Sequence, residues 1–266
     1  MRRTFLVSAL WFLAVATAMS QQAAPARQQA QPSAAPRSRV AAADMKATAI
    51  PGVVAEGAVP AERNKIAVIY PRGEEAVLGD NVDGLPFGRP NDLVVNRSGG
   101  VYFTDPGPNQ AQMKMGHPRT DPAVFYIPAG GQATRVAVDI PDPNGLVLSP
   151  DEKTLYVADT SAEYVSAYDV RPDGKLGARR NFAHLREGKE AEADGMAIDN
   201  DGRLYVSVWG GVDVFDTQGR RLGLIPGSGP GNLAFGGPDR KTLYITGGTS
   251  LSKVVLIAQG PKARAK

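Results

Sequence analysis

The stretch "GRPNDLVVNRSGGVYFTDPG", from Gly88 to Gly107, has the pattern of a β-hairpin. A polar turn opens it, a short apolar run follows at 93–95, and a Gly-rich turn leads into a second apolar run that ends in Thr-Asp. Gly, Asn and Pro supply the backbone angles that chain reversal needs, and short runs of Val, Phe and Tyr favour β-strands. The stretch therefore predicts two antiparallel strands joined by a tight turn.

The same pattern returns three times. The copies are "DPNGLVLSPDEKTLYVAD" (142–159), "EADGMAIDNDGRLYVSVW" (192–209) and "GPGNLAFGGPDRKTLYITG" (229–247), and each places a Tyr in its second strand, as the first stretch does with Tyr102: Tyr156, Tyr205 and Tyr244. Further strands are predicted between the copies at 124–127, 135–138, 165–169, 212–215 and 221–225.

A repeat of about 40–50 residues with four strands is typical of a β-propeller blade. The spacings here are 53, 50 and 37 residues, counted between Asn91, Asn144, Asp194 and Gly231. A two-sheet sandwich is the alternative, but it would not explain why one hairpin recurs in one register. The prediction is an all-β propeller with four full blades and a partial one, whose outer strands are "NKIAVIY" (64–70) and "EEAVLGD" (74–80). An incomplete ring exposes a strand edge, which predicts either closure as a five-bladed ring with a poor first blade or self-association through the exposed edge.

The regions outside the repeats have their own signatures. Residues 1–20 read as a secretory signal peptide, with Arg2 and Arg3 before an apolar run and a small-residue cleavage site. The protein is therefore expected to be exported, either periplasmic or secreted. Residues 21–44 are rich in Gln, Ala, Pro and Ser and predict a disordered linker. The propeller domain is expected at 45–258 and a basic tail at 259–266.

Composition excludes several function classes. The chain has no cysteine, so disulfides and thiol catalysis are excluded. Its net charge is only +3, and the basic excess lies in the terminal regions, so a nucleic-acid partner is not expected. No segment after the signal peptide is long and apolar enough to predict a membrane span. The G-x-S-x-G, H-E-x-x-H and phosphate-loop patterns are also missing from the sequence.

Asn91, Asn144, Asp194 and Gly231, which we call the register residues, each come just before an inner strand. The inner strands of a propeller surround one axis, so these residues should meet at one mouth of the channel. Amide and carboxylate oxygens there predict a site for a divalent cation, Ca²⁺ first and Zn²⁺ or Mg²⁺ as alternatives. The competing interpretation is that these are ordinary turn residues.

The second strands return to the same mouth. Their end residues should therefore lie near the register residues: Thr104, Asp105, Asp159 and Trp209. The loop at 106–122, the longest in the repeats, is predicted either to cover the site or to be a plain surface loop.

At these motifs the sequence resembles the regucalcin/gluconolactonase family of six-bladed propellers, over residues 65–252. The resemblance rests on "GRPNDLVV", "PNGLVLSPDEKTLYVADT", "DGMAIDNDGRLYVSVWGG" and "NLAFGGPDRKTLYITGG". It implies a metal-dependent lactonase acting on a small-molecule lactone. By position, Asn91, Asn144 and Asp194 fall on metal ligands and Asp194 also on the catalytic carboxylate. Arg89 and Asn91 fall on substrate-contacting residues.

The sequence departs from that family at its start. The family's first ligand is a Glu that opens the first blade, and here Glu56-Gly57 is followed by no inner hairpin. Glu56 is therefore a doubtful fourth ligand, and about one and a half blades of the family pattern are missing. Two functions stay open at this point: a metal-dependent lactonase in which Asp194 activates water, and a non-catalytic or degenerate ligand-binding propeller.

Overall fold

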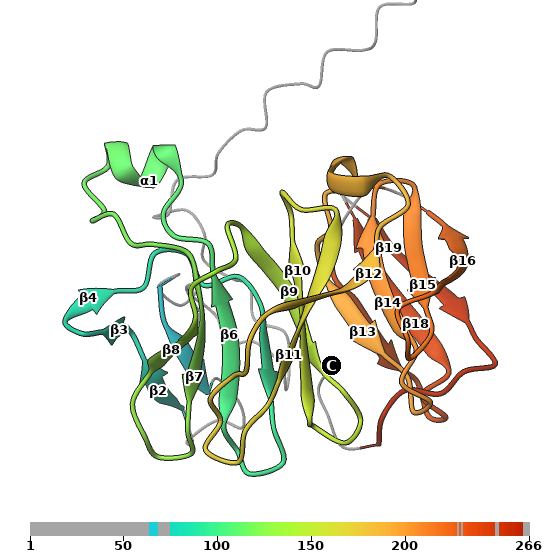
Figure 1. The fold of residues 1–266 in the computed structure, drawn as a ribbon, viewed down its shortest axis with the longest axis horizontal. Helices are drawn as coiled ribbons and strands as arrows, with labels where there is room; N and C mark the ends of the chain where they lie inside the picture. Colours follow the sequence, from blue (N-terminus) through green and yellow to red (C-terminus); the bar gives the residue numbers. More distant parts are fainter. Residues whose placement is uncertain (1–63, 69–74, 228, 230, 248–249, 263–266) are drawn as a thin grey trace, which may run out of the picture. The chain divides into compact units, whose positions relative to one another are not determined.

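The structure is a computed structural model that describes residues 64–68, 75–227, 229, 231–247 and 250–262 (Figure 1). The predicted signal peptide at 1–20, the linker at 21–44 and Glu56 lie outside the described residues.

Four antiparallel sheets follow one another along the chain, one for each repeat. The first contains β5 (Leu93–Val95), β6 (Val101–Asp105), β7 (Ala123–Ile127) and β8 (Thr134–Ala137). The second contains β9 (Pro143–Leu148), β10 (Thr154–Asp159), β11 (Tyr164–Asp169) and β12 (Arg180–His184). The third contains β13 (Met196–Ile198), β14 (Leu204–Val208), β15 (Gly211–Phe215) and β16 (Arg221–Pro226). The fourth contains β17 (Leu233–Gly236), β18 (Thr242–Gly247) and β19 (Ser250–Val255).

The propeller prediction is confirmed, and the strand content differs from the prediction in the second and fourth sheets. The fourth sheet has three strands among the described residues, one fewer than the first three sheets, and its β19 was not predicted. β12 was not predicted because its sequence, RNFAH, is polar and mostly exposed, so it lacks the alternating apolar pattern that marks the other strands. The outermost strand of a blade has one covered face at most, and that weakens its sequence signal.

Two short strand pairs precede the first sheet. β1 (Ile66–Val68) pairs with β2 (Ala76–Gly79), as the predicted outer strands of the partial blade should. β3 (Asn81–Val82) and β4 (Leu85–Pro86) form a hairpin around Asp83 and Gly84. Both turn residues have positive φ, 51° and 77°, as a two-residue type I′ turn requires.

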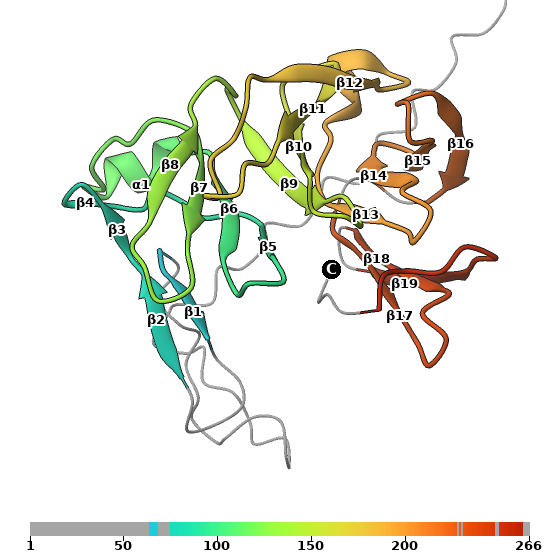
Figure 2. The same ribbon diagram turned by 60° about the horizontal axis from the view of Figure 1, so that its bottom comes forward.

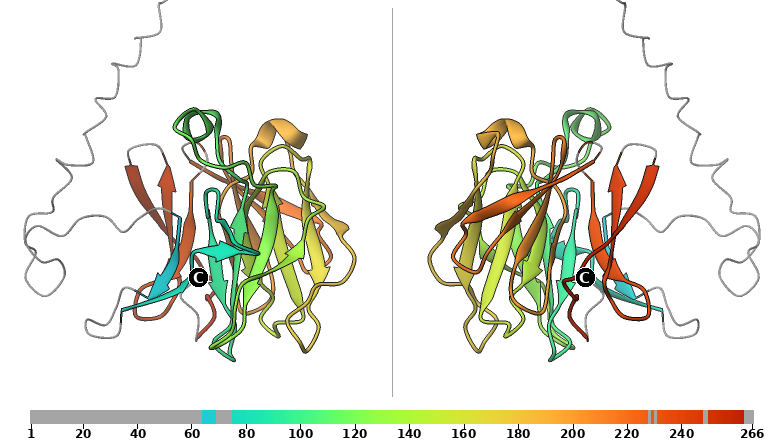
Figure 3. Two further views of the ribbon diagram at one scale, coloured as in Figure 1. Left: turned by 90° about the vertical axis from the view of Figure 1, so that its left-hand side faces the viewer. Right: turned by 90° about the vertical axis from the view of Figure 1, so that its right-hand side faces the viewer.

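Two short helices lie at one end of the sheets, as Figures 1 and 3 show in green and gold. α1 (Gln110–Lys114) interrupts the 106–122 loop, where we predicted no regular structure. Its capping box explains it, because the Asn109 side chain accepts from Gln112 N and the Gln112 side chain accepts from Asn109 N. η2 (Gly188–Ala191) precedes the third sheet. No helix among the described residues is long and apolar enough to cross a membrane.

The core lies between consecutive sheets, because alternate residues of each second strand face opposite neighbours. In β14, Leu204, Val206 and Val208 pack with side chains of the second sheet, whereas Tyr205 packs with side chains of the fourth. β10 follows the same rule, with Leu155 facing the first sheet and Tyr156 the third. We call each such contact between two neighbouring sheets a seam. Figure 2 shows the inner strands β5, β9, β13 and β17 following one another in chain order.

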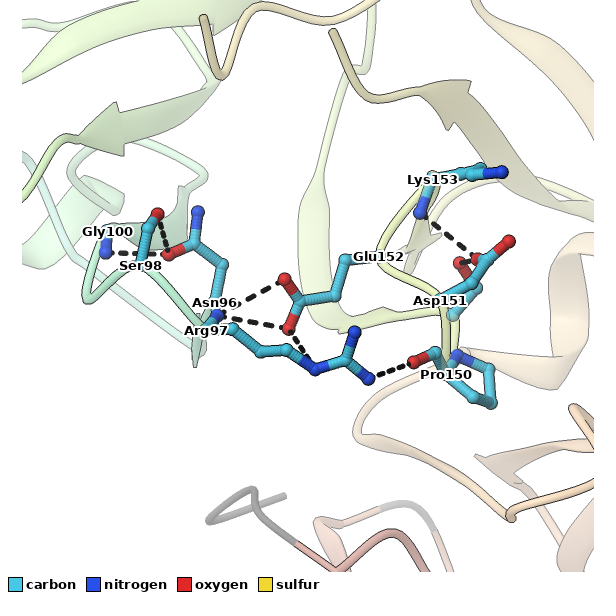
Figure 4. A network of polar contacts seen from close by, with 9 residues as sticks. Asn96, Arg97, Ser98, Gly100, Pro150, Asp151, Glu152 and Lys153 are labelled. Carbon is cyan, nitrogen blue, oxygen red and sulfur yellow. Dashed lines mark hydrogen bonds and ion pairs between the residues drawn. The ribbon is translucent and has the colours of Figure 1, made fainter. Parts of the chain in front are cut away.

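A polar contact joins the first two sheets through the turns that connect their inner and second strands (Figure 4). The main-chain N–H of Arg97 donates to both carboxylate oxygens of Glu152, at 3.0 and 3.2 Å. The Arg97 guanidinium donates to the Pro150 carbonyl at 2.6 Å. Glu152 has a positive φ of 61°, an uncommon conformation for a side-chain-bearing residue. The register residues lie at the other end of the inner strands. Asn91, Asp194 and Gly231 precede β5, β13 and β17 as predicted, whereas Asn144 is the second residue of β9 and not a residue before it.

Candidate functional site

The four register residues lie on adjoining segments. Thr104 Oγ1, at the end of β6, donates to the Asn144 carbonyl at 2.6 Å, which ties the first sheet to the second. Gly195 N donates to the Gly231 carbonyl at 2.9 Å, which ties the third sheet to the fourth. Between the second and third sheets the backbones touch, because a Cβ added to Gly145 would come 2.3 Å from the Asp194 carbonyl oxygen. Glycine at 145 is therefore what lets the Asn144 and Asp194 segments meet.

Asn144 presents one unpaired oxygen. Its side-chain N–H₂ donates to Thr160 Oγ1 at 2.9 Å, so the amide is held on that side. Its Oδ1 is buried and has no hydrogen-bond partner in the described part of the chain. A buried acceptor without a donor is destabilising, and a bound cation would satisfy it. The Asn144 Oδ1 atom therefore fits the role of an oxygen ligand.

Asp194 is a half-buried carboxyl group without a counter-charge. Its main-chain N–H donates to the Ser207 carbonyl at 3.0 Å, which holds it against the end of β14. Burial raises the pKa of Asp194 above its usual range, and a hydrogen bond from Gly195 N–H lowers it in part. Among the described residues Asp194 forms no ion pair. An ionised carboxylate in such a place is stabilised by a cation partner, so Asp194 also fits the predicted ligand set.

Asn91 and Arg89 approach the site from the first sheet. The main-chain N–H of Asn91 donates to the Thr104 carbonyl at 2.9 Å, and its side chain is exposed. Arg89 Nε donates to the Gly107 carbonyl at 3.4 Å. Arg89 also lies close enough to Asp142 to lower the pKa of that carboxyl, although burial raises the same pKa by more. Two of the residues predicted to touch substrate thus share one edge of the site.

Asp105 anchors the segment that carries Arg89 and Asn91. Its side chain is 1% exposed and accepts three main-chain N–H groups: Gly88 at 2.7 Å, Arg89 at 2.8 Å and Gly107 at 2.8 Å. These bonds join the turn before β5 to the start of the 106–122 loop. A carboxylate that accepts several N–H bonds holds a loop strongly. We call this arrangement the Asp105 clamp.

The other residues at the ends of the second strands face different neighbouring sheets, because alternate side chains of a strand point to opposite faces. Asp159 follows the row of β10 that faces the first sheet; its Oδ1 accepts from Ser161 N at 2.9 Å, while Oδ2 is buried and unpartnered among the described residues. Trp209 follows the row of β14 that faces the fourth sheet. Thr104 and Asp159 therefore belong to the seam between the first and second sheets, and Trp209 belongs to the seam between the third and fourth. Thr160 was not among the residues predicted from the sequence, although Thr160 and Trp209 share the same spacing, four residues after the repeated Tyr.

The predicted ligand set contains fewer charged side chains than a cluster of His, Asp and Glu ligands would. Within the described ranges, no group of three His, Asp or Glu side chains is placed to hold a metal ion. The register residues offer one carboxylate and two carboxamides, which are oxygen donors of the type that hard cations accept. Their fit to a cation therefore rests on the unpartnered Asn144 Oδ1 atom and on the uncompensated Asp194 carboxyl.

Comparison with known proteins finds a matching family and several relatives. The family described as SMP-30/Gluconolactonase/LRE-like region matches residues 8–249. The gluconolactonase of Zymomonas mobilis subsp. mobilis is 34% identical over 193 residues, which are 68% of this chain and 54% of that protein. A solved gluconolactonase structure from Xanthomonas campestris is 34% identical with a TM-score of 0.63, and the match covers 73% of this chain and 66% of that one.

A calcium-binding regucalcin from Agrobacterium tumefaciens shares the fold, with a TM-score of 0.57 at 23% identity over 72% of this chain and 68% of that one. The chain spans about half the length of the curated relatives it matches.

Proposed function

The chain belongs to the SMP-30/gluconolactonase/LRE-like family, and on that premise we propose that it hydrolyses a lactone with the help of a divalent cation. The observation that carries the proposal is that the unpartnered Asn144 Oδ1 atom and the Asp194 carboxyl, which has no ion-pair partner among the described residues, lie on touching segments. The similarity to proteins named gluconolactonase supports a lactone as the substrate class.

Asn91, Asn144 and Asp194 would hold the cation, with Ca²⁺ expected first and Zn²⁺ or Mg²⁺ as alternatives. When bound, such a cation supplies Lewis acidity toward the lactone carbonyl. The pKa of Asp194 would be lower with the cation bound, because an opposite charge nearby favours the ionised carboxylate.

Asp194 would act as the general base. Its carboxylate accepts a proton from water while the water oxygen adds to the lactone carbonyl carbon. The ring C–O bond then breaks, and the departing ring oxygen takes the proton, which yields a hydroxy acid. Arg89 and Asn91 would hold substrate oxygens, and the Asp105 clamp keeps the Arg89 backbone in place for this. Hydrogen-bonded positioning of this kind lowers the cost of orienting the substrate.

The decisive experiment replaces Asp194 by Asn, which keeps the shape and removes the charge and the proton acceptor. With D-glucono-1,5-lactone as substrate, we expect turnover to fall by about 10²–10⁴ and the melting temperature in EDTA to change little. Asp201→Asn is the matched control, because Asp201-Gly202 is a second Asp-Gly pair in the same hairpin and its carboxylate is exposed. If Asp194→Asn keeps most of the activity, the general-base assignment is wrong.

A ligand-binding propeller without turnover is the second candidate. It is favoured by the single carboxylate among the register residues. Lactone binding detected by calorimetry, with no hydrolysis at any concentration of Ca²⁺, Zn²⁺ or Mg²⁺, would support this candidate over the first.

We also propose that the protein is exported and that it self-associates. Export rests on the signal-peptide pattern of residues 1–20, and mass spectrometry of the mature protein should find a start near Gln21. Self-association rests on β19, which pairs only with β18 among the described strands and exposes 68% of Leu251 and 74% of Val255. Sedimentation velocity that finds only monomer at micromolar concentration would contradict it.

A further inference from the structure

Trp209 lies at the end of the seam between the third and fourth sheets. The residue follows β14 directly and is 51% exposed. Ser207, two residues earlier, faces the fourth sheet, because its Oγ accepts from Gly231 N at 3.0 Å. Trp209 continues this row, and its ring lies against Gly229, where an added Cβ would come 2.5 Å from the indole. The indole is therefore supported by the segment that leads to the fourth register residue.

The repeat relates Trp209 to Asp194 as it relates Thr160 to Asn144. Thr160 follows the repeated Tyr of its blade by four residues, and so does Trp209. Thr160 N donates to the Asp142 carbonyl at 3.1 Å, and Trp209 N donates to the Ala191 carbonyl at 3.0 Å, so each pairs just ahead of a register residue. The Thr160 hydroxyl touches the Asn144 side chain at 2.9 Å. By the same repeat, the corresponding position in the third blade, the blade of Asp194, is Trp209.

We propose that the Trp209 indole is a wall of the substrate site and that the ring of the lactone packs against it. This inference rests on the proposed function. Trp209 is half exposed to water, and covering an aromatic face with an apolar surface is favourable. A cyclic lactone of sugar type presents a ring face of C–H groups on one side and hydroxyl groups at its rim. Such a ring can lie on the indole while Arg89 and Asn91, on the first sheet, meet its polar atoms.

The indole also gives a direct readout of binding. The chain has two tryptophans, Trp11 in the predicted signal peptide and Trp209. Trp209→Phe supplies the baseline whether or not Trp11 is present. The probe is D-glucono-1,5-lactam, in which a ring N–H replaces the ring oxygen and resists hydrolysis. We expect saturable change in the emission of the wild-type protein and none in Trp209→Phe.

Steady-state kinetics distinguish a substrate-binding role of Trp209 from a catalytic role. With D-glucono-1,5-lactone, Trp209→Ala should raise KM about tenfold and leave kcat within about twofold, because the lost contact is made equally in the ground state and the transition state. Trp209→Phe should raise KM less, since it keeps an aromatic face. Leu222→Ala is the matched control, because Leu222 lies on β16 of the same sheet and is 57% exposed. It should change neither parameter. Melting temperatures establish that the variants are folded.

The outcomes distinguish this inference from the proposed function. If the wild-type protein hydrolyses the lactone and calorimetry detects lactam binding, but the emission and the KM of Trp209→Ala are unchanged, the inference is wrong and the lactonase proposal stands. If no lactone is hydrolysed but the lactam changes the Trp209 emission saturably, the wall is supported and turnover is refuted. If the lactam does not bind and no lactone is hydrolysed, both are refuted.

Discussion

Replacing Asp105 by Asn should show how strongly one buried carboxylate holds the edge of the site. Asp105 accepts N–H groups from Gly88, Arg89 and Gly107 within 2.7–2.8 Å and is 1% exposed. Asn is nearly the same size, but it has one acceptor oxygen, and its N–H₂ group cannot accept. The amide oxygen can keep the hydrogen bonds from Arg89 N and Gly107 N. Gly88 N then faces the N–H₂ group of the new side chain, which is also a donor.

The magnitude follows from these three bonds. A buried N–H left without an acceptor costs about 1–3 kcal/mol, and the two remaining bonds each weaken by about 1 kcal/mol when the acceptor becomes neutral. The neutral amide is less costly to bury than a carboxylate, which offsets about 1 kcal/mol. The net loss is about 3 kcal/mol in the free energy of unfolding. For a domain of this size that corresponds to a melting temperature lower by about 6–12 °C.

Thermal unfolding followed by circular dichroism measures the effect. Asp173→Asn is the matched control: Asp173 is an exposed turn residue whose carboxylate accepts Lys175 N at 3.1 Å, and its loss should change the melting temperature by less than about 2 °C. Activity adds a second readout, because the clamp holds the Arg89 backbone and its loss should raise KM for the lactone. A melting temperature within 2 °C of wild type for Asp105→Asn would refute the clamp as a stabilising element.

Three further outcomes are expected. Gly145→Ala should destabilise by about 1–3 kcal/mol in urea denaturation, because the new Cβ would come 2.3 Å from the Asp194 carbonyl oxygen, whereas Gly223→Ala, with nothing within 4 Å, should be neutral. Glu152→Gln should lower the free energy of unfolding by about 1 kcal/mol, since its carboxylate accepts Arg97 N; an unchanged urea midpoint would contradict this. The single register carboxylate predicts weak Ca²⁺ binding, with Kd about 10⁻⁴–10⁻³ M, so 10 mM CaCl₂ should raise the melting temperature by a few degrees and calorimetry should find no submicromolar site.

Sequence alone predicted the propeller and the register, because both depend on local chemistry. Turn residues at fixed offsets and alternating apolar runs define each hairpin, and its recurrence with a Tyr at one place defines the blade. The inner strands at 93–95 and 196–198 lie where they were expected. The same register nominated Asn91, Asn144 and Asp194 as one set, and their roles stay a prediction.

Tertiary structure decided what surrounds each of those residues. Which way the Asn144 amide turns depends on Thr160, and the Asp105 carboxylate meets partners on two different loops. The seam to which Trp209 belongs follows from how neighbouring sheets pack. A sequence pattern predicts which face of its sheet a side chain lies on, because the alternation of side chains is a property of one strand. The atoms that meet that side chain come from another blade about 40–50 residues away, and only packing between the blades brings them into contact.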